Sequence, residues 1–203
     1  MKEKNLIYLA RFISMLLTPF YLPLVGLLAL FIFSYMSQLP LWYKLFVILL
    51  VYFFTVLLPT VLIRFYRNYH GWTPIELGQR ERRIVPYIIS IVCYYLCFYL
   101  MSSFRLPTFM SRIVMAALLI QVICALINVW WKISTHTAAV GGLAGGLIAF
   151  AAQYSFNPIW WLSFLIIVAG LVGSSRMILR QHSLSQVVAA FFVGLFCAFF
   201  VTI

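Results

Sequence analysis

Seven long apolar stretches, each close to the length that a helix needs to cross a bilayer, dominate this chain of 203 residues. They cover roughly residues 12–36, 41–63, 84–103, 113–131, 137–155, 158–174 and 184–203. Backbone groups in lipid must be hydrogen-bonded within the structure, and stretches of this length fit helices rather than barrel strands. The pattern predicts an all-α fold, a polytopic membrane bundle of six or seven helices that forms one domain over residues 1–203.

Two of these stretches are less regular than the others. The first contains Pro19 and Pro23, which predict a kink at its start or a segment that lies along the membrane interface. The same stretch is long for a signal peptide, so we expect it to be retained as an anchor. The stretch at 158–174 is short, and we expect it to be tilted or partly re-entrant.

The charged residues exclude several kinds of active site. Only 8% of the residues are charged, with 14 Lys and Arg against three acids, all of which are Glu, and the formal net charge is +11. A paired-carboxylate glycosidase, a two-metal carboxylate site and a Ser-His-Asp triad cannot be built from three Glu and no Asp. The positive charge predicts an anionic partner or substrate, or a role in orienting the chain in the membrane.

Polar residues gather in three short segments, at 64–83, 131–136 and 174–186. Two predicted helices separate the first segment from the second, and two more separate the second from the third. An even number of crossings returns the chain to the same membrane face, so the three segments are expected to form one site there. Eleven of the fourteen cations lie on that face, but residues that bind a substrate do not report topology, and six of the eleven are set aside for that reason: Arg80, Arg82, Arg83, Lys132, Arg176 and Arg180. The other five, against three on the opposite face, do not fix the orientation.

Two of the three histidines, His136 and His182, each lie at the start of a predicted helix and close to arginines. Arginine binds phosphate with two parallel hydrogen bonds, and the N-terminus of a helix attracts anions. Phosphoryl transfer needs such groups around the phosphate oxygens together with an in-line nucleophile. The pattern favours a phosphate site; the alternative is a set of basic loops that face lipid headgroups.

The third segment carries a motif that resembles a known family. Ser175-Arg176-x5-His182 resembles the third signature of the type 2 phosphatidic acid phosphatase superfamily, the integral-membrane lipid phosphatases, which reads Ser-Arg-x5-His-x3-Asp. Gln186 stands where the family has Asp. In the family that Asp holds and polarises the nucleophilic histidine. A Gln carbonyl can still accept the ring N–H, although it brings no negative charge.

The other two segments are similar to the remaining signatures of that family. Ser134-Thr135-His136 looks like the second, Pro-Ser-Gly-His, with Ile133 in place of the Pro and Thr135 in place of the Gly. Arg80-x-x-Arg83-x-x-Pro86 looks like a variant of the first, Lys-x6-Arg-Pro, although Pro does not follow Arg83 directly. The resemblance covers roughly residues 76–203.

The resemblance implies a role for each of these side chains. His182 is expected to attack phosphorus and form a phosphohistidine, and His136 to protonate the leaving group and then activate water. Gln186, four residues after His182, is expected to orient its ring. The expected phosphate ligands come from the three polar segments and are Arg176, Arg83, Arg80, Lys132, Ser134 and Thr135. Neither a metal nor a cofactor is expected.

The predicted function is therefore metal-independent hydrolysis of a phosphomonoester or diphosphate on a membrane lipid. A polyprenyl diphosphate, phosphatidate, phosphatidylglycerophosphate and a phosphorylated glycolipid are all compatible with the sequence, and it leaves the oligomeric state open. The alternatives are a lipid phosphotransferase, or a weak or inactive relative that binds or transports a lipid phosphate. The basic residues adjoin membrane spans, so a nucleic-acid partner is not expected.

A glycine-rich run follows the segment that contains His136. Gly141 and Gly145, and likewise Gly142 and Gly146, have the small-xxx-small spacing that allows helices to approach closely in lipid. We expect this run to hold the helix of His136 against the helix that follows His182.

Overall fold

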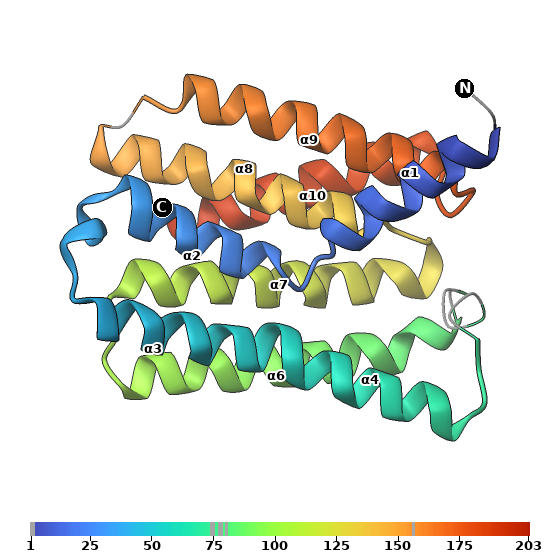
Figure 1. Cartoon of the computed structure of the whole chain (residues 1–203), viewed down its shortest axis with the longest axis horizontal. Helices are drawn as coiled ribbons and strands as arrows, with labels where there is room; N and C mark the ends of the chain where they lie inside the picture. Colours follow the sequence, from blue (N-terminus) through green and yellow to red (C-terminus); the bar gives the residue numbers. More distant parts are fainter. Residues whose placement is uncertain (1–2, 74–75, 77–78, 80, 156) are drawn as a thin grey trace.

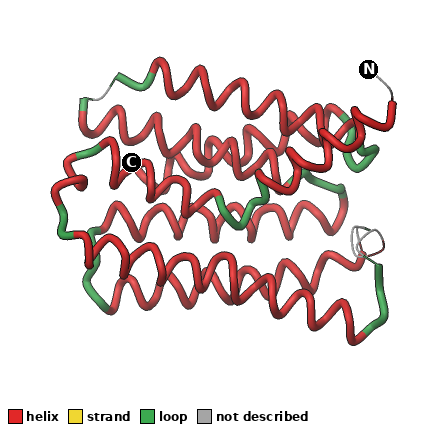
Figure 2. The backbone as a smooth tube through the Cα atoms, viewed as in Figure 1, coloured by secondary structure: helices red, strands yellow, loops and turns green. Residues whose placement is uncertain are grey.

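A computed structural model of the chain describes residues 3–73, 76, 79, 81–155 and 157–203. The described residues are mostly helical, and none of them forms a strand. In chain order the helices are α1 (Glu3–Leu16), α2 (Leu22–Phe33), α3 (Leu41–Tyr52), α4 (Leu58–Tyr69), α6 (Ile84–Ser103), α7 (Thr108–Trp130), α8 (Thr135–Tyr154), α9 (Ile159–Ile178) and α10 (Leu184–Thr202). They run side by side in one bundle (Figure 1, Figure 2), which confirms the predicted all-α architecture.

Six helical segments of the described chain are long and apolar enough to cross a membrane. They are Leu41–Tyr69, Glu81–Ser103, Thr108–Trp130, Thr135–Tyr154, Ile159–Ile178 and Leu184–Thr202. In the first of these, α3 and α4 are joined by the π-helical turn Phe53–Leu57. The chain is thus a multi-pass integral membrane protein. The short stretch expected at 158–174 is a full helix of 20 residues, because α9 continues through the polar residues up to Ile178.

The first apolar stretch does not form one spanning helix. It is divided into α1, of 14 residues, and α2, of 12 residues, and both are shorter than the roughly 20 residues that a bilayer requires. Pro19 lies in the break, and Pro23 lies in the first turn of α2, where its missing N–H is not needed. The predicted kink is therefore a complete break between two helices.

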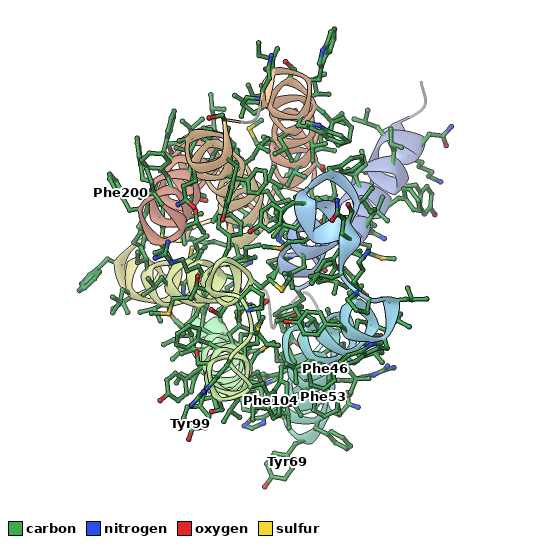
Figure 3. All side chains as sticks on the ribbon, turned by 90° about the vertical axis from the view of Figure 1, so that its left-hand side faces the viewer. Phe46, Phe53, Tyr69, Tyr99, Phe104 and Phe200 are labelled. Carbon is green, nitrogen blue, oxygen red and sulfur yellow. The ribbon has the colours of Figure 1, made fainter. Side chains whose placement is uncertain are left out.

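Aromatic side chains cover much of the outer surface of the bundle. Figure 3 labels six of them, and all six are exposed: Phe46, Phe53, Tyr69, Tyr99, Phe104 and Phe200. In water such a surface would be unfavourable, but in a bilayer it contacts lipid chains of similar polarity. These residues therefore belong to the lipid-facing surface and not to a folded core.

The closest helix pair is α8 with α10, and glycines make the close approach possible. A Cβ built at Gly141 would lie 2.0 Å from the carbonyl oxygen of Phe191, and one at Gly145 would lie 2.0 Å from that of Leu195. On α10, a Cβ at Gly194 would lie 1.8 Å from the carbonyl oxygen of Ala138. The expected packing through Gly141 and Gly145 is present. Gly146 has no atom within 4 Å of its added Cβ and faces open space instead.

We expect Gly145→Ala to destabilise the protein, because the new methyl group forces α8 and α10 apart. The free energy of unfolding should fall by about 1–3 kcal/mol, the usual cost of overpacking a close contact. Thermal unfolding of the purified protein measures this change. The matched control is Gly146→Ala one residue later, and an equal loss of stability in both variants would contradict the assignment of the contact.

The three polar segments lie at the same end of the bundle. Figure 1 places the end of α4, the start of α6, the connection from α7 to α8 and the connection from α9 to α10 on one side. The even number of spanning helices between the segments produces this arrangement, as predicted. Because α8 and α10 both start at this end, the positive ends of two packed helix dipoles point to the same region.

Candidate active site

A tight turn at the end of α9 brings His182 back beside Arg176. The N–H of Gln181 donates to the carbonyl of Arg176 over 3.0 Å, and the N–H of Arg180 donates to that of Met177 over 2.8 Å. This is the hydrogen-bond pattern of a Schellman motif, with Arg180 in the left-handed conformation at φ 52°. The five residues between Arg176 and His182 thus form the turn that ends α9.

Gln186 fixes the orientation and the tautomer of His182. Its Oε1 accepts a hydrogen bond from the backbone N–H of Ser183 over 3.2 Å, so this atom is the carbonyl oxygen of the amide. The same oxygen lies 3.1 Å from Nδ1 of His182, which must therefore carry the proton and donate it. Ser183 and Gln186 also form the capping box of α10. The result is a histidine whose Nε2 has a free lone pair.

The environment of His182 keeps the imidazole neutral. Only 7% of its surface is exposed, and its Nε2 has no hydrogen-bond partner among the described residues. Burial, followed by the positive charges of Arg83 and Arg176, lowers the pKa of His182 from 6.5 to about 3, against the opposing effect of the Gln186 hydrogen bond. A neutral, buried and oriented nitrogen has the properties of a nucleophile.

We expect Gln186→Glu to shift the acidic limb of the kcat/KM profile to higher pH. The carboxylate keeps the capping box but places a negative charge beside Nδ1 of His182. This charge favours the imidazolium and raises the pKa of His182. Neutral His182 then persists over a narrower range, and the limb should move by about one pH unit or more. The measurement is phosphate release against pH for the native and variant proteins.

Gln186→Leu is the matched control for that experiment. It removes the acceptor without adding a charge, so the rate should fall at all pH values and the acidic limb should not move upward. An acidic limb that is the same in Gln186→Glu as in the native protein would contradict the assigned contact between Gln186 and His182.

His136 lies in the first turn of α8, close to the other histidine. Ser134 is the N-cap of this helix, and its hydroxyl accepts a hydrogen bond from the N–H of Thr137 over 3.5 Å. The imidazole of His136 is an electrostatic neighbour of His182 and interacts with the backbone of Ser14 in α1. Its Nδ1 is buried and has no hydrogen-bond partner in the described part of the chain. Two imidazoles thus meet at the adjacent N-termini of α8 and α10.

Three cations surround the histidines, and we refer to Arg83, Lys132 and Arg176 as the cationic cluster. All three act electrostatically on His182, and Arg83 and Arg176 also act on His136. Burial, followed by the charges of Arg83 and Arg176, lowers the pKa of Lys132. Like charges held together in a buried region repel one another, and an anion in their midst relieves that repulsion.

The acidic residue Glu76 forms its ion pair outside this cluster. Three Glu are present and no Asp. Glu76 pairs with Arg82 over 3.6 Å, and the guanidinium of Arg82 lies 4.6 Å from the ring of Trp72. Arg82 is thus engaged by Glu76 and Trp72, outside the cationic cluster.

The site also contains Ser14, a residue that no sequence motif predicts. Arg176 is 7% exposed, and its guanidinium donates through Nη1 to the hydroxyl of Ser14 over 2.7 Å. Its Nε has no hydrogen-bond partner within the described residues, so part of the planar fork stays available. Ser14 lies in an apolar sequence, and only the fold brings α1 against the end of α9. A second unpredicted neighbour is Tyr87, whose phenol interacts with Arg83.

The remaining predicted residues either have other roles in the structure or lie outside the part that it describes. Arg80 lies outside the described residues. Ser134 is fully buried and caps α8, and Thr135 lines the cavities beside the site. Arg180 is exposed and forms the turn that ends α9. The residues that the structure brings together are therefore Arg83, Lys132, His136, Arg176, His182 and Gln186.

Comparison with known proteins adds one finding. Residues 123–203 match the family model of the PAP2 superfamily. The matched region runs from the last turns of α7 to the end of the chain and includes both histidines, Lys132, Arg176 and Gln186. It does not include Arg83 or Ser14. No curated protein and no solved structure gives a significant match to the chain.

Proposed function

Since the chain belongs to the PAP2 superfamily, whose members are generally phosphatases, we propose that it is an active lipid phosphate phosphatase with His182 as its nucleophile. Membership supports phosphatase- or phosphotransferase-type activity on lipid phosphates. The finer proposal is metal-independent hydrolysis of a phosphomonoester or diphosphate through a phosphohistidine.

One observation carries this proposal: the nitrogen that would attack phosphorus belongs to a buried, neutral imidazole, has no hydrogen-bond partner among the described residues, and has a cluster of cations as its electrostatic neighbours. Gln186 holds Nδ1 of His182 over 3.1 Å, and Nε2 is left with its lone pair. Arg83, Lys132 and Arg176 are its electrostatic neighbours. A structural histidine in a helical turn needs neither the free nitrogen nor the surrounding cations.

In the first step the lone pair of His182 Nε2 attacks phosphorus in line with the leaving oxygen. The P–N bond forms, the bond from phosphorus to the leaving oxygen breaks, and His136 gives a proton to that oxygen. The cationic cluster stabilises the charge on the equatorial oxygens, with the fork of Arg176 as its strongest element. Free N–H groups at the starts of α8 and α10 add to this stabilisation.

In the second step a water molecule attacks the phosphorus of the phosphohistidine. His136, which has lost its proton, accepts one from the water, and the P–N bond breaks to return the lone pair to Nε2. Inorganic phosphate leaves, and both histidines regain their initial states. A phosphotransferase differs only in that a lipid or sugar hydroxyl replaces water in this step.

The experiment that tests the proposed function is phosphate release from a panel of lipids by the purified, reconstituted protein. The panel holds a polyprenyl diphosphate, phosphatidate, phosphatidylglycerophosphate and a phosphorylated glycolipid. We expect release from at least one lipid without added metal and in the presence of a chelator. Binding without release from every lipid would contradict the phosphatase and favour a lipid-phosphate binder.

A further inference from the structure

A deep apolar cavity of about 240 Å³ lies within the bundle beside the candidate site. Its walls come mainly from α2, α7, α8 and α9, and they are almost entirely hydrocarbon. Residues that define its course along these helices are Gly26, Ile113, Gly146, Leu147, Phe150 and Phe164. An apolar cavity of this kind has no affinity for water or for a charged group, so its occupant must be apolar.

The cavity adjoins a smaller pocket at the Arg83 side of the candidate site. This smaller pocket of about 130 Å³ is lined by Arg83 and Tyr87, and both hollows share Pro19, Gln121 and Thr135 in their walls. Thr135 immediately precedes His136. A molecule whose phosphate lies in the cationic cluster can therefore extend an apolar chain directly into the cavity.

The other edge of the cavity opens toward lipid. Val25 and Phe33 on α2 and Phe164 on α9 line the cavity, yet they are 46%, 52% and 58% exposed. Side chains that are both cavity-lining and exposed mark an opening, here between α2 and α9. A lipid chain can enter through it from the bilayer without passing through water.

The depth of the cavity exceeds that of one lipid leaflet. Along α8 the lining runs from Thr135 in the first turn to Phe150 near the last, which at 1.5 Å per residue is about 22 Å. The hydrocarbon core of a bilayer is about 30 Å thick, so one leaflet supplies about 15 Å. An acyl chain of ordinary membrane length ends near the middle of the bilayer, whereas this cavity continues beyond it.

We propose that the cavity binds a single apolar chain longer than one leaflet, of the polyisoprenoid class, and that Gly146 keeps its deep half open. This inference rests on the proposed function, since the chain belongs to the lipid whose phosphate is hydrolysed. Gly146 lines the cavity, and a Cβ added to it meets no atom within 4 Å, so a larger side chain there projects into the cavity without displacing a helix.

The test compares Gly146→Phe with the matched control Gly170→Phe. Gly170 lies on α9, outside the cavity, and its added Cβ also meets no atom within 4 Å. The substrates are a long-chain polyprenyl diphosphate, geranyl diphosphate, which has two isoprene units, and a diacyl phosphatidate. We expect the native protein to prefer the polyprenyl chain over phosphatidate. In Gly146→Phe the ratio of kcat/KM for the long chain to that for the short chain should fall about tenfold or more.

Gly170→Phe should leave the ratio unchanged. An unchanged ratio in Gly146→Phe, or a preference of the native protein for the diacyl lipid, would overturn the proposal. If Gly146→Phe does not fold, as judged by thermal unfolding, Gly146→Leu replaces it with the same expected direction.

A binding experiment separates failure of this inference from failure of the proposed function. A polyprenyl phosphate with a photoactivatable group at the far end of its chain should label α2, α8 or α9 near Phe150 in the native protein, and Gly146→Phe should abolish that labelling. This result is expected even if no lipid is hydrolysed, in which case only the phosphatase proposal fails. Labelling confined to the outer surface of the bundle would overturn the cavity proposal whether or not phosphate is released.

Discussion

His182→Ala is expected to abolish phosphate release, with a fall in kcat of about a thousandfold or more. The substitution removes the Nε2 lone pair that forms the P–N bond, while the cationic cluster and the capping box of α10 remain. Because Gln186 also accepts from the N–H of Ser183, the start of α10 does not depend on the imidazole. The measurement is steady-state phosphate release from the best lipid of the panel.

The control for His182→Ala is binding of the same lipid, followed by the change in thermal stability that the lipid produces. A stable variant that binds but does not release phosphate identifies a lost nucleophile. Full activity in His182→Ala would show that another group attacks phosphorus, and the assignment of His182 would be wrong.

Arg176→Lys is expected to lower kcat/KM by about a hundredfold, although the charge is kept. The planar guanidinium binds two phosphate oxygens at once, whereas an ammonium group acts as a point charge. Lysine also cannot donate to Ser14 and to phosphate with the geometry of the fork, which in the native protein uses Nη1 for Ser14 at 2.7 Å. Loss of one well-placed donor in a buried site has an effect of this size.

Arg180→Lys is the matched control, four residues later in the same segment. Arg180 is exposed in the turn that ends α9, and we expect its replacement to leave kcat/KM nearly unchanged. Equal losses in both variants would indicate that the segment acts through its overall charge, and unchanged activity in Arg176→Lys would contradict a bidentate role.

Much of this site was predictable because its residues lie in three short polar segments separated by even numbers of apolar helices. That pattern places His136, His182, Arg83 and Arg176 at one membrane face before any coordinates are known. The spacing from His182 to Gln186 likewise predicts their contact, since residues four apart share one face of a helix. Local chemistry and helix counting are sufficient for these features.

The contribution of the first two helices could not be predicted in the same way. Ser14 is one hydroxyl in an apolar run, and its hydrogen bond to Arg176 exists only because the chain breaks near Pro19 and α1 packs against α9. The cavity has the same origin, because α2 forms one of its walls. The spacing of apolar residues along a sequence does not indicate where a cavity lies between helices. Gly146 was expected to pack against a helix, and only the structure shows that it faces this space.

The most direct test of the mechanism is detection of the phosphorylated enzyme. The protein is mixed with its lipid substrate, quenched at alkaline pH to preserve phosphohistidine, digested and analysed by mass spectrometry. We predict one phosphoryl group on the peptide that contains His182 during turnover, and none in His182→Ala. Phosphate release by the native protein with no phosphorylated His182, or with the phosphoryl group on another residue, would contradict the phosphohistidine mechanism.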